Sequence, residues 1–324
     1  MPAGSTRRCC APRCSIHKMN VLILSASRGW HTDELERALS ERGHASSVRP
    51  YEGLVSHLGG DPPKARLSSG GTPIFEADAV LARIIPGGSL EQVIYRVDAL
   101  HWIEARGVPV MNSPRTIERT VDKFYTTALL REAGLPTPET VVCENTEEAV
   151  AAVRAMGAAV IKPLFGSLGE GMVRVSDPDV ARRIVRSLEQ VHAVFYVQRE
   201  IDHGGRDVRV FVVGGRVLGA IERRAPAGEW RTNIARGAAA RPCDVSGRWE
   251  DLAVGAAAAV GADYAGVDLL PSRDGDVFVL EVNGLPGWQG LQQATGLDVA
   301  DAIVTQLELK VRGTRPHAVA SRLA

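Results

Sequence analysis

Short hydrophobic runs alternate with stretches of helical period over the first third of the chain. Three runs have the length of buried strands: residues 21–24, 79–84 and 108–111. The helices predicted between them cover residues 33–42 and 89–106. Thr32 stands at the N-cap of the first helix, and Gly107 ends the second. Strands that alternate with helices predict a small doubly wound α/β unit over residues 19–112.

The middle of the chain continues this alternation and predicts a second unit over residues 113–197. Ser113 and Pro114 have the N-cap and N1 order of a helix start, and this helix is predicted to run through Lys123 to Ala133. Four strands are predicted beyond it: residues 140–143, 159–162, 172–175 and 194–198. Two further helices are predicted over residues 147–156 and 178–190.

A third unit, over residues 198–311, is predicted to contain an antiparallel sheet. Its strands are predicted over residues 206–213, 216–222, 266–270 and 278–283. The first two join at Gly214-Gly215 and the last two at Asp274-Gly275, which are hairpin signals. Helices are predicted over residues 252–260 and 299–309. The whole pattern predicts an α/β (α+β) fold, with a disordered extension over residues 1–18 and a loose tail over 312–324.

The predicted strand at residues 278–283 ends in two oxygen-bearing side chains. Glu281 and Asn283 are two residues apart, so their side chains point to one face of the strand. If the strand at residues 266–270 pairs with it, Asp268 comes close to Glu281. Two carboxylates and an amide are suitable ligands for Mg²⁺ beside nucleotide phosphates. On this segment alone, solvated charges at a strand end are an equally good interpretation.

Composition excludes several classes of protein. Of 324 residues, 45% are hydrophobic and 23% are charged, and Lys plus Arg equals Asp plus Glu at 38 each. No overall charge therefore favours nucleic acid or an anionic membrane as a partner. No run reaches the ~18 apolar residues of a membrane span, and residues 1–18 lack the apolar core of a secretory signal. We expect a cytoplasmic location.

The five cysteines are too unevenly placed to predict a disulfide framework. Cys9, Cys10 and Cys14 lie near His17, and together they could bind a metal ion. No second pair of ligands follows at zinc spacing, so a disordered segment is the preferred interpretation.

A glycine-rich segment joins the strands predicted around residues 161 and 173. Its glycines and one serine allow backbone N–H groups to surround phosphate oxygens, and Lys162 adds positive charge. It is neither a Walker A loop nor a dinucleotide fingerprint, because it closes on no Gly-Lys-Ser/Thr and opens no helix. A flexible turn is the alternative, and Lys123 by itself is equally a helix-surface lysine.

Residues 222–233 concentrate arginines after a predicted strand. The guanidinium groups of Arg223, Arg224 and Arg231 suit bidentate binding of phosphate or carboxylate. From this segment alone, a solvated basic loop is the slightly preferred interpretation.

The order of these parts resembles that of the ATP-grasp fold, and most closely that of the RimK-like α-L-glutamate ligases. The resemblance extends over roughly residues 20–310 and is carried by six segments: residues 122–123, 162–171, 207–209, 221–233, 265–268 and 281–287. It implies an ATP-grasp fold with an N-terminal doubly wound α/β domain. The ATP-grasp part would divide into a central subdomain, residues 113–197, and a C-terminal subdomain, residues 198–311.

The resemblance also implies roles for individual residues. ATP phosphates would contact Lys123, Lys162 and the loop that contains Gly166, Ser167, Gly169 and Gly171. The adenosine end would contact Gln198, Arg199, Glu200 and Asp207. The residues facing the reacting phosphate would be Arg231 and Asn233. Two Mg²⁺ ions, which Mn²⁺ could replace, would be held by Asp268, Glu281 and Asn283.

This sequence departs from the relatives at two positions. Arg199 directly follows the hinge glutamine, where the family usually has an acidic residue, and Leu285 stands where relatives often have a small polar one. Residues 84–92 and 122–130 resemble the tetrahydromethanopterin:α-L-glutamate ligase branch more than the ribosomal-protein modifier. Arg83 and Arg96 could hold carboxylates of the acceptor, with salt bridges inside the N-terminal unit as the alternative.

The resemblance implies an ATP- and Mg²⁺-dependent ligase that joins L-glutamate to an acceptor carboxylate through an acyl phosphate. The acceptor would be a pterin cofactor, with a ribosomal protein C-terminus or an amino-acid carrier protein as alternatives. A non-catalytic ATP-binding relative would lack a metal ligand, and none is missing. A nicotinamide oxidoreductase would need a glycine fingerprint after residues 21–24, which the sequence does not supply. We expect small-molecule or peptide partners and a homo-oligomer.

Overall fold

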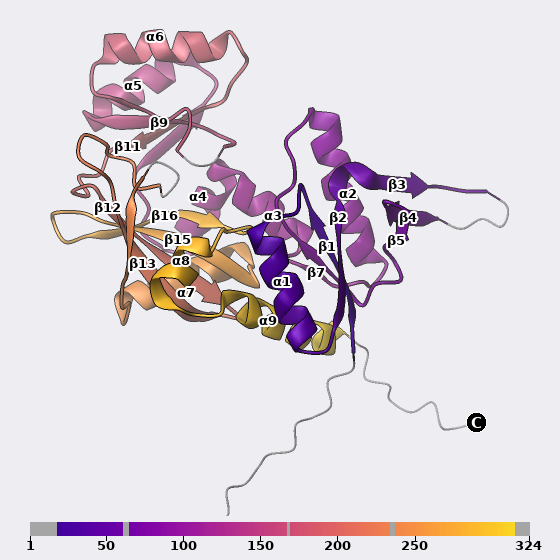
Figure 1. Cartoon of the computed structure of the whole chain (residues 1–324). Coiled ribbons are helices and arrows are strands. Elements are labelled where there is room, and N and C mark those ends of the chain that lie inside the picture. The colour runs from indigo at the N-terminus through magenta and orange to yellow at the C-terminus, as the bar shows by residue number, and fades with distance from the viewer. Residues whose placement is uncertain (1–17, 61–64, 167–168, 234–236, 315–324) are drawn as a thin grey trace, which may run out of the picture.

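The computed structural model describes residues 18–60, 65–166, 169–233 and 237–314. Its first unit contains a parallel sheet in the order β2-β1-β6-β7. The strands are β1 (Asn20–Ser25), β2 (Ala45–Pro50), β6 (Ala79–Ala82) and β7 (Val110–Met111). Helix α1 (Trp30–Glu41) and helix α2 (Leu90–Ala105) belong to the cores on opposite faces of this sheet (Figure 1). The predicted doubly wound α/β arrangement is confirmed.

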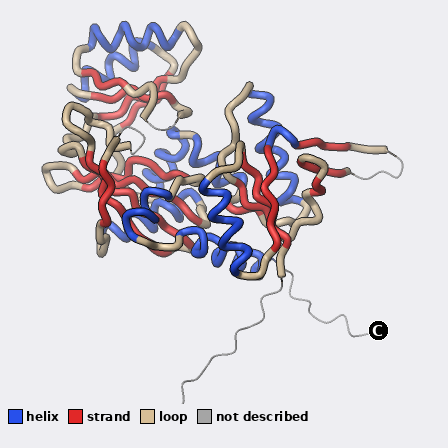
Figure 2. Tube along the Cα trace, in the orientation of Figure 1, coloured by secondary structure: helices blue, strands red, loops and turns tan. Residues whose placement is uncertain are grey.

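The first unit also contains a small antiparallel sheet that the sequence pattern does not predict. It follows the 3₁₀ helix η1 (Tyr51–Gly53), and its strands are β3 (Leu54–His57), β4 (Arg66–Ser69) and β5 (Thr72–Pro73). Figures 1 and 2 show this hairpin as an arm that reaches away from the parallel sheet. Strands of two to four residues with polar side chains carry too little alternation for periodicity to detect.

Two predicted helix boundaries are wrong. The single helix expected up to Ala133 is divided into α3 (Pro114–Val121) and α4 (Lys123–Glu132), because Asp122 is extended and its carboxylate caps Tyr125 N–H. Thr32 is not the N-cap of α1. That position belongs to Gly29, and the Thr32 hydroxyl accepts the Gly29 N–H from inside the first turn.

The middle unit is an antiparallel sheet in the order β10-β9-β11-β8. Its strands are β8 (Thr140–Cys143), β9 (Ala159–Pro163), β10 (Val173–Val175) and β11 (Phe195–Arg199). Helices α5 (Thr146–Met156) and α6 (Pro178–Glu189) lie side by side on one face (Figure 1), and Val153 and Val185 pack against Ile161 and Val197 of the sheet. These elements confirm the predicted pattern.

The C-terminal unit contains a five-stranded antiparallel sheet in the order β14-β13-β12-β15-β16. Its strands are β12 (Arg206–Val213), β13 (Arg216–Arg224), β14 (Ala239–Pro242), β15 (Tyr264–Pro271) and β16 (Val277–Asn283). Helix α7 (Arg248–Val260) packs on one face over a core of small and β-branched residues. The predicted hairpin of β15 and β16 is confirmed, and its register places Asp268 opposite Glu281.

One hydrophobic cluster joins the first and last parts of the chain. It contains β1 and α1 residues such as Ile23 and Leu39, together with Trp288, Ile303 and Leu307 from the C-terminal segment. Helix α8 (Gln289–Thr295) also contributes, and α9 (Val299–Thr314) lies against α1 (Figure 1). Helix α9 extends beyond the predicted end at residue 309. The N-terminal sheet therefore buries one face against the end of the chain.

Two expectations concern residues that the structure does not describe. The N-terminal extension (residues 1–17) with its cysteines and the tail beyond residue 314 lie outside the described ranges. None of the helices in the described part of the chain combines the length and the apolar character needed to span a bilayer.

Candidate active site

Charged side chains follow one another across the C-terminal sheet. Arg209 of β12 lies opposite Asp268 of β15, and Asp268 lies opposite Glu281 of β16. Asp207 of β12 lies opposite Arg223 of β13. Opposite residues in an antiparallel pair share a face of the sheet and are about 5 Å apart. The face turned away from α7 therefore carries a row of charges of both signs.

Asp268 is the centre of this row. Its buried carboxylate accepts two hydrogen bonds of 2.7 Å from Arg209 and pairs with Arg223 at 2.9 Å. Burial alone would raise the pKa of Asp268, but the charges of Arg209 and Arg223 outweigh it and lower the pKa to about 2. Arg223 also binds Asp207, which accepts a hydrogen bond from Thr232. Asp268 is therefore a carboxylate anion at neutral pH.

Three oxygen donors are available to a divalent cation. Asp268 and Glu281 are cross-strand neighbours, and Asn283 ends β16. Asn283 Oδ1 accepts the Leu285 N–H at 3.0 Å, which leaves one lone pair of this oxygen for a metal ion. Among the described residues, no group of three His, Cys, Asp or Glu side chains gathers at metal-binding distance. With the Asn283 amide as the third donor the set would be all oxygen, which fits Mg²⁺.

Lys162 extends from β9 into the space opposite this row. Its Nζ donates to Gln198 Oε1 at 2.6 Å and lies 5.9 Å from the centre of the Tyr196 ring. Burial lowers the pKa of Lys162 to about 8, against the opposing effect of the Glu281 carboxylate. Gln198 also donates to Tyr196 Oη, so this network holds the lysine in one orientation.

Lys123, at the start of α4, forms hydrogen bonds with the glycine-rich loop. Its Nζ donates to the Gly166 carbonyl at 2.8 Å and to the Leu164 carbonyl at 3.3 Å. Burial lowers the pKa of Lys123. Gly166, Gly169 and Gly171 have φ values of 145°, 69° and 69°, a region that favours glycine. Ser167 lies outside the described residues.

The predicted adenine hinge is formed by the end of β11. Gln198 is buried and its side chain accepts a hydrogen bond from Lys162, so a contribution of this side chain to nucleotide binding through that lysine stays a prediction. The Arg199 guanidinium turns outward to Glu139 and to the Met156 carbonyl, whereas Glu200 pairs with Arg174. The unusual Arg199 is therefore occupied by a surface ion pair in this structure.

The arginine-rich loop reaches the glycine-rich loop from the other subdomain. Arg231 donates to Glu229 and, at 3.3 Å, to the Gly169 carbonyl. The Arg231 and Arg174 guanidinium groups lie 5.7 Å and 5.4 Å from the ring of Trp230. Through the Arg231–Gly169 hydrogen bond the arginine-rich loop contacts the glycine-rich loop.

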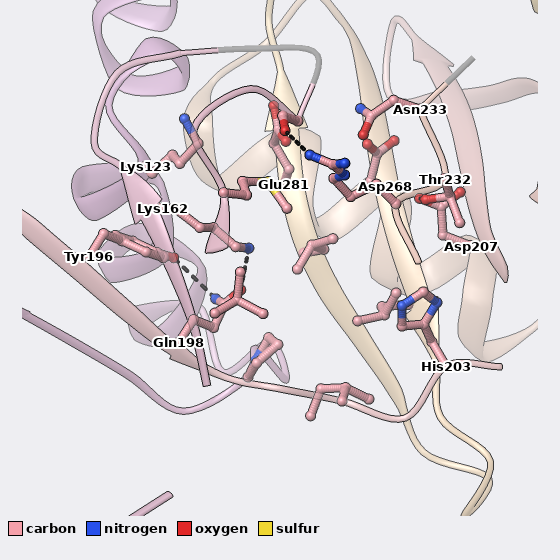
Figure 3. Close-up of a pocket in the computed structure, with 18 of the residues that line it drawn as sticks. Lys123, Lys162, Tyr196, Gln198, His203, Asp207, Thr232, Asn233, Asp268 and Glu281 are labelled. Atoms are coloured by element: carbon pink, nitrogen blue, oxygen red, sulfur yellow. Dashed lines mark hydrogen bonds between the residues drawn. The ribbon is translucent and has the colours of Figure 1, made fainter. Parts of the chain in front are cut away.

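A single pocket collects most of the predicted site residues. Its lining includes Lys123, Lys162, Gly166, Gly169, Gln198, Arg199, Glu200, Asp207, Arg231, Asn233, Asp268, Glu281 and Asn283. Figure 3 shows the lysines on one side of this pocket, Asp207, Thr232 and Asn233 on the other, and Asp268 between them. Gly171, Arg83 and Arg96 do not line it. Arg83 and Arg96 are buried in the first unit and donate to backbone carbonyls, so an acceptor-binding role for them stays a prediction.

Some residues of the pocket were given no role by sequence reasoning. Among them are Tyr196, His203, Arg209, Trp230 and Thr232. Arg209 carried a signal, because it stands two residues after Asp207 and so shares a face of the strand with it. Tyr196 and His203 carried none, since an isolated aromatic residue on a strand is ordinarily part of a core and a single histidine in a loop has no pattern around it.

Comparison with known proteins identifies the scaffold. A family model described as the RimK-like ATP-grasp domain matches residues 120–307. The chain belongs to the RimK-like ATP-grasp family. It is therefore an ATP-dependent ligase that forms an amide bond, and ATP and Mg²⁺ are its cofactors.

Two relatives are similar over nearly their whole length. The tetrahydromethanopterin:alpha-L-glutamate ligase of Methanosarcina acetivorans is 35% identical over 317 residues, which cover 89% of this chain and 98% of the relative. The probable alpha-L-glutamate ligase of Alkalilimnicola ehrlichii is 35% identical over 298 residues, which cover 91% and 97%.

Solved structures agree on the fold. The ATP-grasp ligase PsnB, in a complex with a phosphomimetic variant of its minimal precursor, Mg and ADP, superimposes with a TM-score of 0.71 at 23% identity, covering 90% of this chain and 98% of that one. A RimK domain ATP-grasp protein from Sphaerobacter thermophilus gives 0.66 at 23% identity, covering 89% and 98%. The predicted ATP-grasp fold is confirmed.

Proposed function

We propose that this RimK-like enzyme joins the amine of L-glutamate to a carboxylate of a pterin cofactor. The observation that supports this chemistry best is the convergence of two lysines, a glycine-rich loop and three oxygen donors on one pocket. The choice of L-glutamate and of a pterin follows the names of the relatives that are 35% identical. A protein C-terminus and a carrier protein are the competing acceptors.

The proposed reaction forms no covalent bond to the enzyme. The acceptor carboxylate takes the γ-phosphoryl group of ATP, and ADP is released. The amine of L-glutamate then attacks the acyl carbon, the C–O bond to phosphate breaks, and phosphate leaves with the electron pair. Catalysis of such a transfer depends on positioning and charge neutralisation.

Different residues of the pocket would bind the phosphates, the adenosine and the metal ions. Lys123 and Lys162 bind phosphate oxygens beneath the glycine-rich loop, and Arg231 with Asn233 faces the transferred group. Gln198, Arg199, Glu200 and Asp207 belong to the adenosine end. Asp268, Glu281 and Asn283 hold two Mg²⁺ ions, or Mn²⁺ in their place, and a bound ion supplies further neutralisation of phosphate charge. Arg231 must exchange Glu229 for phosphate to take this role.

An ADP-release assay tests the proposal. Enzyme, MgATP and L-glutamate are combined with one acceptor at a time: a reduced pterin with a carboxylate side chain, a peptide C-terminus, a deazaflavin or an α-aminoadipate carrier. We expect ADP release that requires both L-glutamate and the pterin, and a product heavier by one glutamyl residue. If ADP is released with the peptide and not with the pterin, the acceptor is a peptide C-terminus. If ADP is released with another amine in place of L-glutamate, the proposed amine donor is wrong. The homo-oligomer and the cytoplasmic location stay predictions.

A further inference from the structure

The segment after the metal-site strand is held by side chains of the first unit. We call residues 284–288 the strap, because they connect Asn283 to α8. Between Gly284 and Gly287, the described structure contains no backbone–backbone hydrogen bond. The strap's conformation therefore depends on the side chains that bind it.

Three residues of the first unit bind the strap at every second residue. Asn112 donates to the Gly284 carbonyl at 2.6 Å, and Arg83 donates to the Pro286 carbonyl at 3.0 Å. His31 Nε2 accepts the Trp288 N–H at 3.1 Å. These three bonds reach from the ends of β7 and β6 and from the first turn of α1 to one short segment.

Arg83 occupies an unusual environment for a cation. It is only 2% exposed, and no carboxylate of the described residues lies within ion-pair distance of it. Its guanidinium instead covers the ring of Trp288, 4.7 Å from the centre, and donates to Tyr264 Oη at 3.2 Å. Burying a charge without a counter-ion lowers the stability of the fold. Because Arg83 contacts an aromatic ring and oxygen acceptors in place of a carboxylate, its role is not that of an ion-pair partner.

His31 and Asn112 complete the anchorage. His31 is neutral when it accepts the Trp288 N–H, and burial followed by the charge of Arg83 lowers the pKa of His31 to about 4. Asn112 is fully buried, and its two amide atoms also bond the backbone of Tyr264 and Asp263. The strap is thus fixed to β15 as well as to the first unit.

The strap in turn orients Asn283. The Leu285 N–H of the strap donates to Asn283 Oδ1, and Gly284 follows Asn283 directly. A shift of Pro286 would therefore turn the amide oxygen that completes the donor set. Residues that orient ligands in this way affect metal affinity although they do not touch the ion.

We propose that Arg83 is a positioning residue: through the strap it aims the Asn283 amide oxygen at the nucleotide-bound cation. This inference rests on the proposed metal site. It assigns Arg83 a role different from holding an acceptor carboxylate.

Binding of ADP with and without Mg²⁺, measured by calorimetry, tests the role without turnover. For Arg83→Met we expect ADP affinity in EDTA to stay within about twofold of the native value. The gain in ADP affinity on adding Mg²⁺ should shrink roughly tenfold, as for other residues that orient metal ligands. Arg83→Lys keeps a donor for Pro286 and should recover part of this gain.

The controls separate positioning from general loosening. Arg37 also reaches from the first unit to the C-terminal segment, at Asp298, but far from the strap in sequence and contacts. Arg37→Met should leave the Mg²⁺ gain unchanged. If Arg83→Met does not fold, His31→Ala removes the acceptor of Trp288 N–H together with the ring contacts to Trp288 and Trp30, and it should lower the gain in the same direction.

Two results would overturn the inference. An unchanged Mg²⁺ gain in folded Arg83→Met, or an equal loss of ADP affinity with and without Mg²⁺, would each show that Arg83 does not act on the metal donors. Glu281→Gln tests the underlying assignment separately: if that variant keeps the native Mg²⁺ gain, the metal site itself is wrong.

Discussion

At the scale of single residues, the pocket holds its charges in place through neighbours that a ligand must partly displace. The carboxylate of Asp268 binds Arg209 and Arg223, and Arg231 binds Glu229. Ion pairing offsets the desolvation cost of these charges while no phosphate or cation is bound. The same pairing decides which substitutions give interpretable results.

Glu281→Gln is the cleanest test of the metal site. It removes one anionic donor and leaves Arg209 and Arg223 paired with Asp268, so the fold should survive while ATP turnover is abolished. Asp268→Asn should also abolish turnover, but it leaves Arg209 without its carboxylate and Arg223 with Asp207 alone, and it should lower the free energy of unfolding by roughly 3 kcal/mol. ADP release and urea denaturation check both variants, and near-native turnover in either one contradicts the assignment.

Lys162 predicts a pH dependence of nucleotide capture. Its pKa of about 8 in the free enzyme means that the charge is present below pH 8 and is lost as pH rises above it. We expect kcat/KM for ATP to be flat near pH 7 and to fall toward tenfold per pH unit above about pH 8. In Lys162→Arg the guanidinium remains charged, so overall activity falls but the alkaline decline disappears. A decline that persists in this variant would belong to another group.

At the scale of elements, the site depends on how closely the strap approaches α3. A methyl group at Gly284 would lie 2.4 Å from Thr120 Oγ1, and that hydroxyl is already bonded to the Thr116 carbonyl. The break between α3 and α4 at Asp122 then lets Lys123 begin a new helix that faces the glycine-rich loop. Helix α3 thus lies against the strap, and helix α4 binds the glycine-rich loop through Lys123.

Gly284→Ala should therefore destabilise the fold. Overpacking against Thr120 is expected to lower the free energy of unfolding by about 1–3 kcal/mol. Adding Thr120→Ala removes the closest contact and should restore part of this loss. Gly313→Ala, in α9 with no atom within 4 Å of the new methyl group, is the matched control and should be neutral or slightly stabilising. Equal effects at the two glycines would contradict the packing argument, and chemical denaturation decides between them.

At the scale of the whole molecule, the two ends of the chain form one core. Arg42 of the first unit binds Glu308 through two hydrogen bonds of 2.8 Å, and His44 binds the same buried carboxylate at 2.9 Å. Burial opposes ionisation of Glu308, but the hydrogen bonds from Arg42 and His44 outweigh it and hold its pKa below the usual range. The first unit is therefore tied to α9 by charge as well as by hydrophobic contact.

Arg42→Met should weaken this connection without touching the pocket. Glu308 would keep only His44, and loss of one partner of a buried pair is expected to cost about 3 kcal/mol of unfolding free energy. Because Arg42 contacts no residue of the pocket, ADP affinity of the folded protein should be unchanged. Urea denaturation and calorimetry check the two expectations. Weaker ADP binding at unchanged stability would contradict them.

The sequence by itself determined the local elements and the order of the chemical groups. Hydrophobic period and turn residues located the principal helices and strands, and the Asp274-Gly275 hairpin placed Asp268 opposite Glu281. These features are encoded within a few residues, so pattern and turn chemistry are sufficient to predict them. The short β3–β5 strands and the helix break at Asp122 were missed, because a few polar residues or one capping carboxylate decide them.

The tertiary structure decided which distant groups meet. Arg209 binds Asp268 across 59 residues of sequence, and Arg83 reaches Pro286 across 203. No local period encodes such contacts, because the first arises when two strands distant in sequence pair in one sheet and the second when the first unit packs against the C-terminal segment. The same packing places the Arg83 side chain against the strap, a contact that exists only in the folded molecule, while its predicted role toward the acceptor stays a prediction.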